Sequence, residues 1–132
     1  MDRSYLHLCL PAQDSLAAAF EAVGRAVCAM PGWATAAGND GYRAWRHGGS
    51  GAALLAVAVG LDPVVLSVGR GASSRGAGEP ATATRDAVAA VRRAVPALGA
   101  REVADWELLP LVRQAQERLE WRARAEARGG TA

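Results

Sequence analysis

The sequence predicts a small α+β domain in which an antiparallel sheet carries its helices on one face. Three observations support this fold class. Apolar residues alternate with polar ones near the N-terminus, they recur at spacings of three and four in three later segments, and three short strand-like segments follow one another through tight connections. A chain of 132 residues suits one domain, which we expect at residues 1–128, with a frayed tail at 129–132.

The first predicted strand covers residues 4–10, where three leucines alternate with Tyr, His and Cys. A helix follows, capped by Asp14 or Ser15, because apolar residues recur at spacings of three and four over residues 16–30. The Pro-Gly pair at 31–32 ends this helix.

A three-stranded antiparallel meander is predicted at residues 42–47, 52–59 and 64–69, after a polar loop at 38–41. The connections are short and rich in Gly, Asp and Pro, which is typical of hairpins. The second and third of these strands are apolar at nearly every position. We therefore expect them to lie at the centre of the sheet or to have both faces covered.

Residues 70–80 are rich in Gly, Ala and Ser without apolar periodicity, so we expect a mobile surface loop there. Thr84 is expected to cap a second helix. The buried stripe of this helix is predicted at Val88, Val91 and Val95, which recur at helical spacing.

Residues 101–108 predict a fifth strand with Trp106 in the core, although the sequence leaves open whether this segment is a strand or the opening of the last helix. That helix is expected over residues 111–128. Its inward stripe ends at Leu119, so Trp121 lies off the stripe and would be exposed in a monomer.

The element order β-α-β-β-β-α-β-α predicts a two-layer ferredoxin-like variant, with one strand of the meander added. With the first strand left out, the order resembles the type III secretion chaperone and YbjN-like topology. The segment Leu119-Glu120-Trp121-Arg122 is also similar to the Trp among Arg and Glu residues in the last helix of that family. Residues 99–110 are too short for the strand pair of that topology, so we assign no family.

The expected binding face is the sheet surface that the helices leave uncovered. The polar side of the first strand and one side of the next strand are expected to emerge there together. Trp, Tyr and Arg anchor protein interfaces, so we interpret this face and the last helix as contact surfaces. The residues expected to bind are Tyr5, His7, Arg43, Trp45, His47, Trp121 and Arg122.

Two more specific interpretations of these residues remain open. In the first, His47 is the base that activates a Cys9 thiolate. In the second, His7, Cys9 and His47 together ligate zinc. Neither has a supporting spacing signature such as CxxC, so the leading interpretation has no catalytic residue and no metal ion.

Two other groups of residues are weaker candidates. Residues 69–78 lie between a strand and a helix, as a phosphate-binding loop does, but they lack GK[ST], and we expect a connector. Asp105 and Glu107 share one side of the fifth predicted strand. Two acids can cooperate in such a place, and charge there also discourages edge pairing.

The composition excludes several function classes. All 15 basic residues are Arg and are interleaved with 13 acidic ones, so a net charge of +2 is too small and too dispersed for a nucleic-acid binder. The longest apolar run, 52–59, is too short to cross a bilayer, and the N-terminal apolar stretch lacks the length of a signal peptide. We expect a cytoplasmic protein with Cys9 and Cys28 reduced.

The leading hypothesis is a non-catalytic protein-interaction module, an accessory, immunity or chaperone-like factor that binds a protein partner or itself. It is expected to use no cofactor, nucleic acid or membrane. The alternative is a small cofactor-independent enzyme of the dimeric α+β barrel type, acting on an apolar ligand with His7, His47 or Cys9 as acid, base or nucleophile. An enclosed pocket with convergent polar groups would favour the enzyme, and a grooved apolar patch would favour the module.

Overall fold

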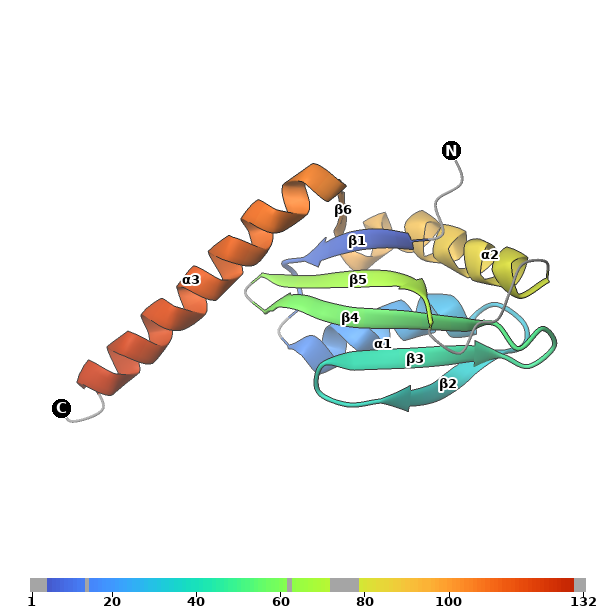
Figure 1. Ribbon diagram of the computed structural model, residues 1–132, viewed down its shortest axis with the longest axis horizontal. Coiled ribbons are helices and arrows are strands. Elements are labelled where there is room, and N and C mark those ends of the chain that lie inside the picture. Colours follow the sequence, from blue (N-terminus) through green and yellow to red (C-terminus); the bar gives the residue numbers. More distant parts are fainter. Residues whose placement is uncertain (1–4, 14, 62, 72–78, 130–132) are drawn as a thin grey trace.

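The structure is a computed structural model that describes residues 5–13, 15–61, 63–71 and 79–129. Within these ranges the chain forms a six-stranded antiparallel sheet and three α-helices, so the predicted α+β class is confirmed (Figure 1). In chain order the elements are β1 (Tyr5–Leu10), α1 (Leu16–Cys28), β2 (Trp33–Gly38), β3 (Tyr42–His47), β4 (Ala53–Leu61), β5 (Val64–Arg70), α2 (Glu79–Ala94), the 3-10 turn η1 (Pro96–Leu98), β6 (Arg101–Val103) and α3 (Asp105–Gly129).

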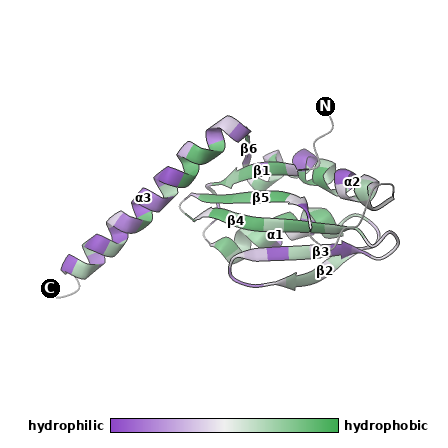
Figure 2. Cartoon of the chain, in the orientation of Figure 1, coloured by the Kyte–Doolittle hydropathy of each residue, from purple (hydrophilic) through white to green (hydrophobic). Residues whose placement is uncertain are grey.

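The strand order across the sheet is β2-β3-β4-β5-β1-β6. The meander is confirmed as β3, β4 and β5, and the two strands that are apolar at nearly every position lie in the middle of the sheet. β1 joins the sheet between β5 and β6, so the N-terminal strand pairs with segments that lie far along the chain. Figure 2 shows the apolar residues concentrated in these central strands.

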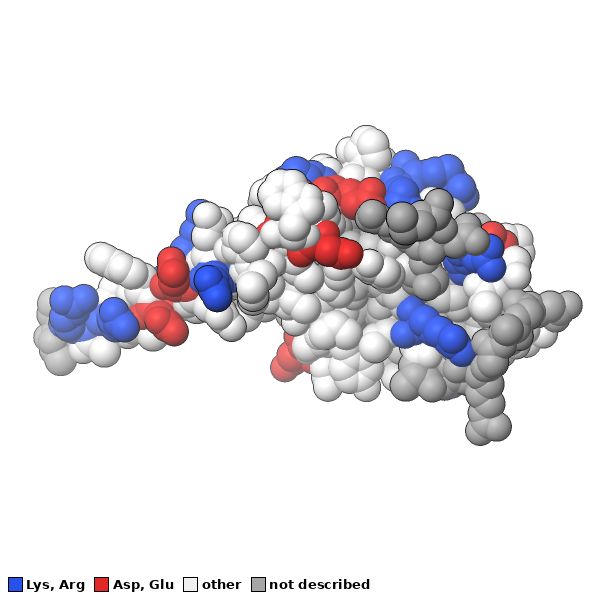
Figure 3. Space-filling model, turned by 45° about the horizontal axis from the view of Figure 1, so that its top comes forward, with Lys and Arg blue, Asp and Glu red and all other residues white. Residues whose placement is uncertain are grey.

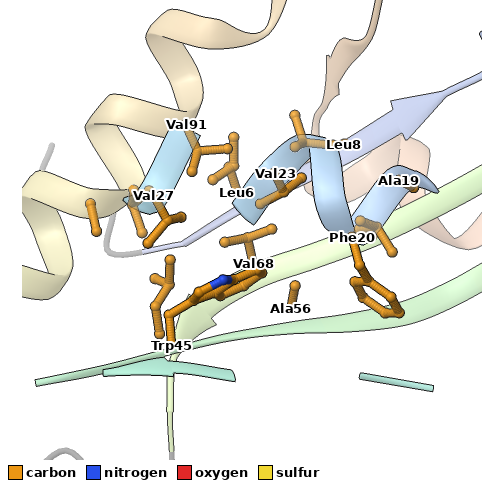
Figure 4. Packing of buried hydrophobic residues seen from close by; sticks show 14 of the residues in the cluster. Leu6, Leu8, Ala19, Phe20, Val23, Val27, Trp45, Ala56, Val68 and Val91 are labelled. Carbon is orange, nitrogen blue, oxygen red and sulfur yellow. The ribbon is translucent and has the colours of Figure 1, made fainter. Parts of the chain in front are cut away.

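Helices α1 and α2 cover one face of the sheet, which we call the covered face (Figure 1). The core lies between this face and the two helices, and it contains Phe20 and Val23 from α1 and Val91 from α2 (Figure 4). Trp45 is only 1% exposed there. It packs beneath Gly24, where a Cβ atom would come within 3.2 Å of the indole nitrogen, so the missing side chain makes room for the ring.

The first helix begins as predicted. Its N-cap is Ser15, whose hydroxyl accepts a hydrogen bond from the backbone N–H of Ala18 at 3.1 Å. Its buried residues fall on one stripe, as expected from their spacing. In the second helix, the predicted stripe of Val88, Val91 and Val95 is buried.

The start of α2 was predicted wrongly. The helix begins at Glu79, so Thr84 lies inside it rather than at its cap. Thr84 is buried, and its hydroxyl lies 3.5 Å from the carbonyl oxygen of Ala53, to which it donates. From the sequence alone, a Thr whose hydroxyl donates to a neighbouring strand looks the same as a Thr that caps a helix. The hydrogen bond to β4 shows that Thr84 is of the first kind.

Strand β2 was missed, because residues 33–38 contain three alanines and no branched aliphatic residue. The segment is nevertheless a strand, since it pairs with β3 along its length, with a register shift between Thr35 and Ala37. It forms one edge of the sheet. The polar loop expected at 38–41 is the turn that joins β2 to β3, where the side chain of Asn39 accepts hydrogen bonds from the backbone of Gly41 and Tyr42.

The segment at 101–108 is divided between a short strand and the opening of the last helix. Only Arg101–Val103 forms a strand, and α3 begins at Asp105. The prediction that Trp106 lies in the core is therefore wrong, and its side chain is 80% exposed. The expected mobile loop and anion site at 70–80 fall largely on residues 72–78, and the frayed tail falls largely on 130–132, both outside the described residues.

Helix α3 touches the sheet through its first half alone. Leu108 and Leu111 pack on a small second cluster formed by Cys9, Val65 and Val103, on the face opposite α1 and α2. Ala115 is buried beside Gly60. Every residue from 116 to 129 is exposed, and Figure 1 shows this half of α3, which we call the arm, running away from the strands. Within the described residues, every helix is too short or too polar to cross a bilayer.

Candidate functional site: the open sheet face and the C-terminal arm

The two predicted sets of site residues lie on opposite faces of the sheet. Residues that pair directly across neighbouring strands point to the same face of the sheet. Arg43 pairs with Ala56, Ala56 with Val68, and Val68 with the core residue Leu6. Arg43, Trp45 and His47 alternate along β3 with the same orientation, so all three lie on the covered side. The same register links Tyr42 through Val57 and Ser67 to His7 on the other face. The expectation that both sets emerge together is therefore wrong.

The three predicted residues of β3 pack against their neighbours on the covered side. The guanidinium of Arg43 lies 5.5 Å from the centre of the Phe20 ring, and Trp45 is buried beneath α1. The ring of His47 lies 5.4 Å from that of Trp33, and its Nδ1 atom lies 2.8 Å from the hydroxyl of Ser50. These contacts hold β3 and its turn in place.

Tyr5 and His7 lie on the face turned away from α1 and α2, which we call the open face, and they belong to a chain of hydrogen bonds. His7 Nδ1 lies 2.7 Å from Ser67 Oγ, and His7 Nε2 lies 3.0 Å from Asp105 Oδ1. The hydroxyl of Tyr5 donates to Asp105 Oδ2 at 2.8 Å. The chain joins β5, β1 and the first turn of α3.

In this series of hydrogen bonds, Ser67, His7 and Asp105 have the order of a nucleophile, its base and the group that orients the base. If Nε2 of His7 donates to Asp105, Nδ1 is free to accept the Ser67 proton. The His7 side chain is 14% exposed and that of Asp105 is 58% exposed, so the carboxylate end of this series of hydrogen bonds is in solvent. Sequence reasoning missed Ser67, although alternation along β5 places it on the same face as its partner His7.

The Cys9–His47 pair and the His7–Cys9–His47 zinc site are not assembled. Cys9 lies on the open side of the sheet, beneath α3, whereas His47 is on the covered side. Burial raises the pKa of the Cys9 thiol, and the nearby charge of Arg101 lowers it by less. A thiol with a raised pKa is a weak nucleophile at neutral pH.

The two acids expected on one strand side lie in the first turn of α3, where each holds the helix to the sheet. Asp105 binds Tyr5 and His7. Glu107 accepts from the backbone N–H of Ala104 at 3.2 Å and from Arg101 at 3.0 Å. These two hydrogen bonds lower the pKa of Glu107, and the one from the backbone of Ala104 has the larger effect. An acid at this position caps the helix, as in a capping box.

The open face contains a hollow of about 840 Å³ over β2, β3 and β4. Its walls are mainly small and aliphatic, and Arg46 is the charged residue among those that line it. Arg46 is exposed and has no ion-pair partner in the described part of the chain. The lining residues are Ala36, Ala37, Asn39, Gly41, Tyr42, Ala44, Trp45, Arg46, Ala53, Leu55, Val57 and Gly71.

Sequence reasoning did not find this hollow, because its walls are alanines that carry no chemical signature. One signal was present: β4 is apolar on both of its sides, which predicts that both faces of that strand are covered. Around Leu55 and Val57, however, only the face toward α1 and α2 is covered. On the opposite face, α3 reaches only the end of β4 near Gly60. Leu55 and Val57 remain partly exposed in the hollow.

The arm carries the second exposed apolar group. Trp121 is 67% exposed, as predicted, but so is the rest of the arm, and Leu119, which was predicted to face inward, is 38% exposed because α3 leaves the sheet after Ala115. Arg118 and Arg122 line a separate hollow against the loops at the end of the sheet, so they face the body of the protein. Figure 3 shows acidic and basic side chains alternating along α3, whereas much of the body beside it is white.

Comparisons of this chain with protein-family models, with curated protein sequences and with solved structures found no match in any of the three.

Proposed function

We propose that this protein is a non-catalytic protein-interaction module, an accessory, immunity or chaperone-like factor that binds its partner through the open face of β2–β4 and the arm of α3. The observation that carries the proposal is the apolar hollow of about 840 Å³ over β2, β3 and β4, on the part of the open face that α3 does not cover. Exposed apolar patches of this kind mark contact sites on soluble proteins.

The arm supports the same function. Every residue of this half-helix of about 20 Å is exposed, although Arg118 and Arg122 face the body. A helix with so little burial is marginal in water, so a partner would stabilise it. Trp121 is the type of residue that anchors interfaces when it enters a pocket of small residues. Its neighbour Arg122 adds a charge at the body side of the arm.

The proposed roles of the predicted residues divide by face. Tyr5 and His7 lie on the open side and hold α3 in position through Asp105, so we assign them to the binding surface. Arg43, Trp45 and His47 support that surface from behind, through packing on the covered side.

The proposal includes the two-layer ferredoxin-like interpretation of the fold. With the β2–β3 hairpin left out as the addition, the order along the chain is β-α-β-β-α-β up to β6, and α3 follows as a further addition. The strand order β4-β5-β1-β6, antiparallel throughout, is compatible with this interpretation. We also propose a cytoplasmic protein that binds a protein partner or a second copy of itself, and not nucleic acid or a membrane.

Differential capture tests the proposed function. The tagged wild-type protein and the variants Ala37→Glu in the hollow and Trp121→Glu on the arm are used as baits in a lysate of the organism that carries the gene. Ala17→Glu on the exposed side of α1 and Trp106→Glu at the other end of α3 are matched controls. We expect binding, to another protein or to untagged copies of this chain, that both controls keep and both test variants lose. If every bait retains the same proteins, the proposed function is wrong.

A second candidate function is a small cofactor-independent enzyme, and the Ser67–His7–Asp105 chain favours it. The open face would then hold an apolar ligand beside Ser67. Hydrolysis of a p-nitrophenyl ester, or labelling by a fluorophosphonate, should be lost in Ser67→Ala and His7→Gln but kept in His47→Gln. Activity that survives Ser67→Ala would remove this candidate.

A further inference from the structure

We infer that the partner seated on the open face is a second copy of this chain, and that two copies exchange arms, each placing Trp121 in the hollow over β2, β3 and β4 of the other. The inference rests on the proposed function, because it names the occupant of the same surface.

The first step is that one chain carries two exposed surfaces that fit each other. The hollow is apolar and lined by the small side chains of Ala36, Ala37 and Ala44, which leave room for a large ring. Trp121 is a large ring with 67% of its surface exposed. An aromatic side chain of this size buries roughly 150–250 Å² when it enters such a pocket.

The second step is that the chain does not fill its own hollow. Trp121 is absent from the lining of that hollow, and the arm leaves the sheet at the end of β4 near Gly60. Figure 1 shows the arm running outward, away from β2 and β3. Arg118 and Arg122 line a hollow at the end of the sheet, whereas Trp121 is absent from that lining and stays 67% exposed, so a second molecule can reach it.

The third step is charge complementarity. Glu117 lies one helical turn before Trp121, on the same side of the arm. Neither Glu117 nor Arg46 has an ion-pair partner elsewhere in the described ranges. Arg46 is the charge at the hollow, so a helix that places Trp121 there would bring a carboxylate close to this guanidinium.

The fourth step is symmetry. An exchange of arms is isologous, so every contact of one arm in one hollow is made a second time by the other pair. The arm of residues 116–129 is about 20 Å long, while three strands span only about 10–15 Å, so it can cross the hollow. Two buried tryptophans supply roughly 300–500 Å² of the roughly 1,200–2,000 Å² that a stable interface needs, so the two arms must bury the remainder along their length.

Sedimentation velocity of the full chain, from about 1 µM to about 1 mM, tests the inference. We expect the wild-type mass to rise from 13.6 kDa to twice that value as the concentration increases. Trp121→Glu and Ala37→Glu should each weaken the dimer at least about 100-fold. The matched controls Trp106→Glu and Ala17→Glu should stay dimeric, and circular dichroism should show all four variants folded.

Charge reversal and cross-linking distinguish this arm-exchanged dimer from a dimer that forms through another surface. Arg46→Glu and Glu117→Arg should each weaken the dimer about 10-fold, and the double variant should recover most of the loss. In a Cys28→Ser background, an Arg46→Cys chain mixed with a Glu117→Cys chain keeps Trp121 and should form a disulfide between the two chains. A dimer that keeps its affinity in Trp121→Glu and gives no such disulfide would overturn the inference.

A wild-type chain that stays monomeric across the whole range would also overturn it. That outcome would leave the proposed function standing if the capture experiment finds another protein that depends on Ala37 and Trp121. If both experiments fail, the proposed function fails with the inference.

Discussion

The two faces of the sheet are both apolar, yet only one of them is a core. On the covered face, Trp45 and Leu54 are almost fully buried beneath α1 and α2. On the open face, Leu55 and Val57 stay partly exposed around a hollow. Apolar patterning therefore identifies a surface that must be covered. Helices α1 and α2 cover one face, whereas α3 covers the open face beside β6 and at the end of β4 and leaves Leu55 and Val57 partly exposed.

This difference separates stability from binding. Changes on the covered face should lower the free energy of unfolding of a single chain, whereas changes on the open face should leave folding nearly intact and alter association. A loss of stability in a single chain therefore indicates the covered face, and a loss of association indicates the open face.

The largest effect is expected at Trp45. Trp45→Ala should lower the free energy of unfolding by about 3–5 kcal/mol, because it leaves a cavity beneath Gly24. Urea unfolding followed by circular dichroism measures the loss. Trp106→Ala, at an 80% exposed position, is the control and should change stability by less than about 0.5 kcal/mol. Equal losses in the two variants would contradict the assignment of the core.

Two adjacent leucines give the sharpest test of the division between faces. Leu54 is fully buried on the covered face, and Leu55 points into the hollow. Leu54→Ala should cost about 2–4 kcal/mol, and Leu55→Ala about 1 kcal/mol or less, in urea unfolding of the dilute chain. A larger loss for Leu55→Ala would mean that the open face is already packed within one chain.

The hydrogen-bonded chain through His7 should affect α3 more than the rest of the fold. His7→Gln should cost about 1 kcal/mol and raise amide hydrogen exchange in the first turns of α3, because Asp105 loses a partner. His47→Gln is the matched control, since His47 bonds Ser50 within a turn. Unchanged exchange in α3 would show that the hydrogen-bonded chain does not hold that helix.

The smallest effect is expected at Glu107. Its lowered pKa means that the carboxylate contributes stability above its unfolded pKa and loses it as the pH falls through the folded pKa. Glu107→Gln should therefore lower the Tm by less than about 2 °C at pH 7, and this loss should shrink as the pH falls below about 4.3, the ordinary pKa of a glutamate. A difference that grows at low pH would contradict this sign.

Local patterns predicted the elements well, and long-range pairing decided the site. The alternation of Leu6, Leu8 and Leu10 and the cap at Ser15 need only neighbouring residues, and both were predicted. The relation between His7 and Trp45 depends on two intervening strands, β4 and β5, so neither sequence segment contains it.

The same reason explains what was missed at the site. Ser67 meets His7 across a strand pair that joins residues 60 positions apart, and Asp105 joins them from the start of a helix. The hollow is made by alanines, whose role comes from the space they leave. Trp121 was found because helical periodicity is local and predicts its exposure.

The central claim is that the hollow and Trp121 are covered when the protein is assembled. Carbene footprinting with mass spectrometry measures this directly on the wild-type chain at low and high concentration, or with and without a captured partner. We predict that labelling of Leu55 and Trp121 falls together on assembly while labelling of Trp106 stays constant. Labelling of Leu55 and Trp121 that remains at the monomer level in every assembled state would contradict the account.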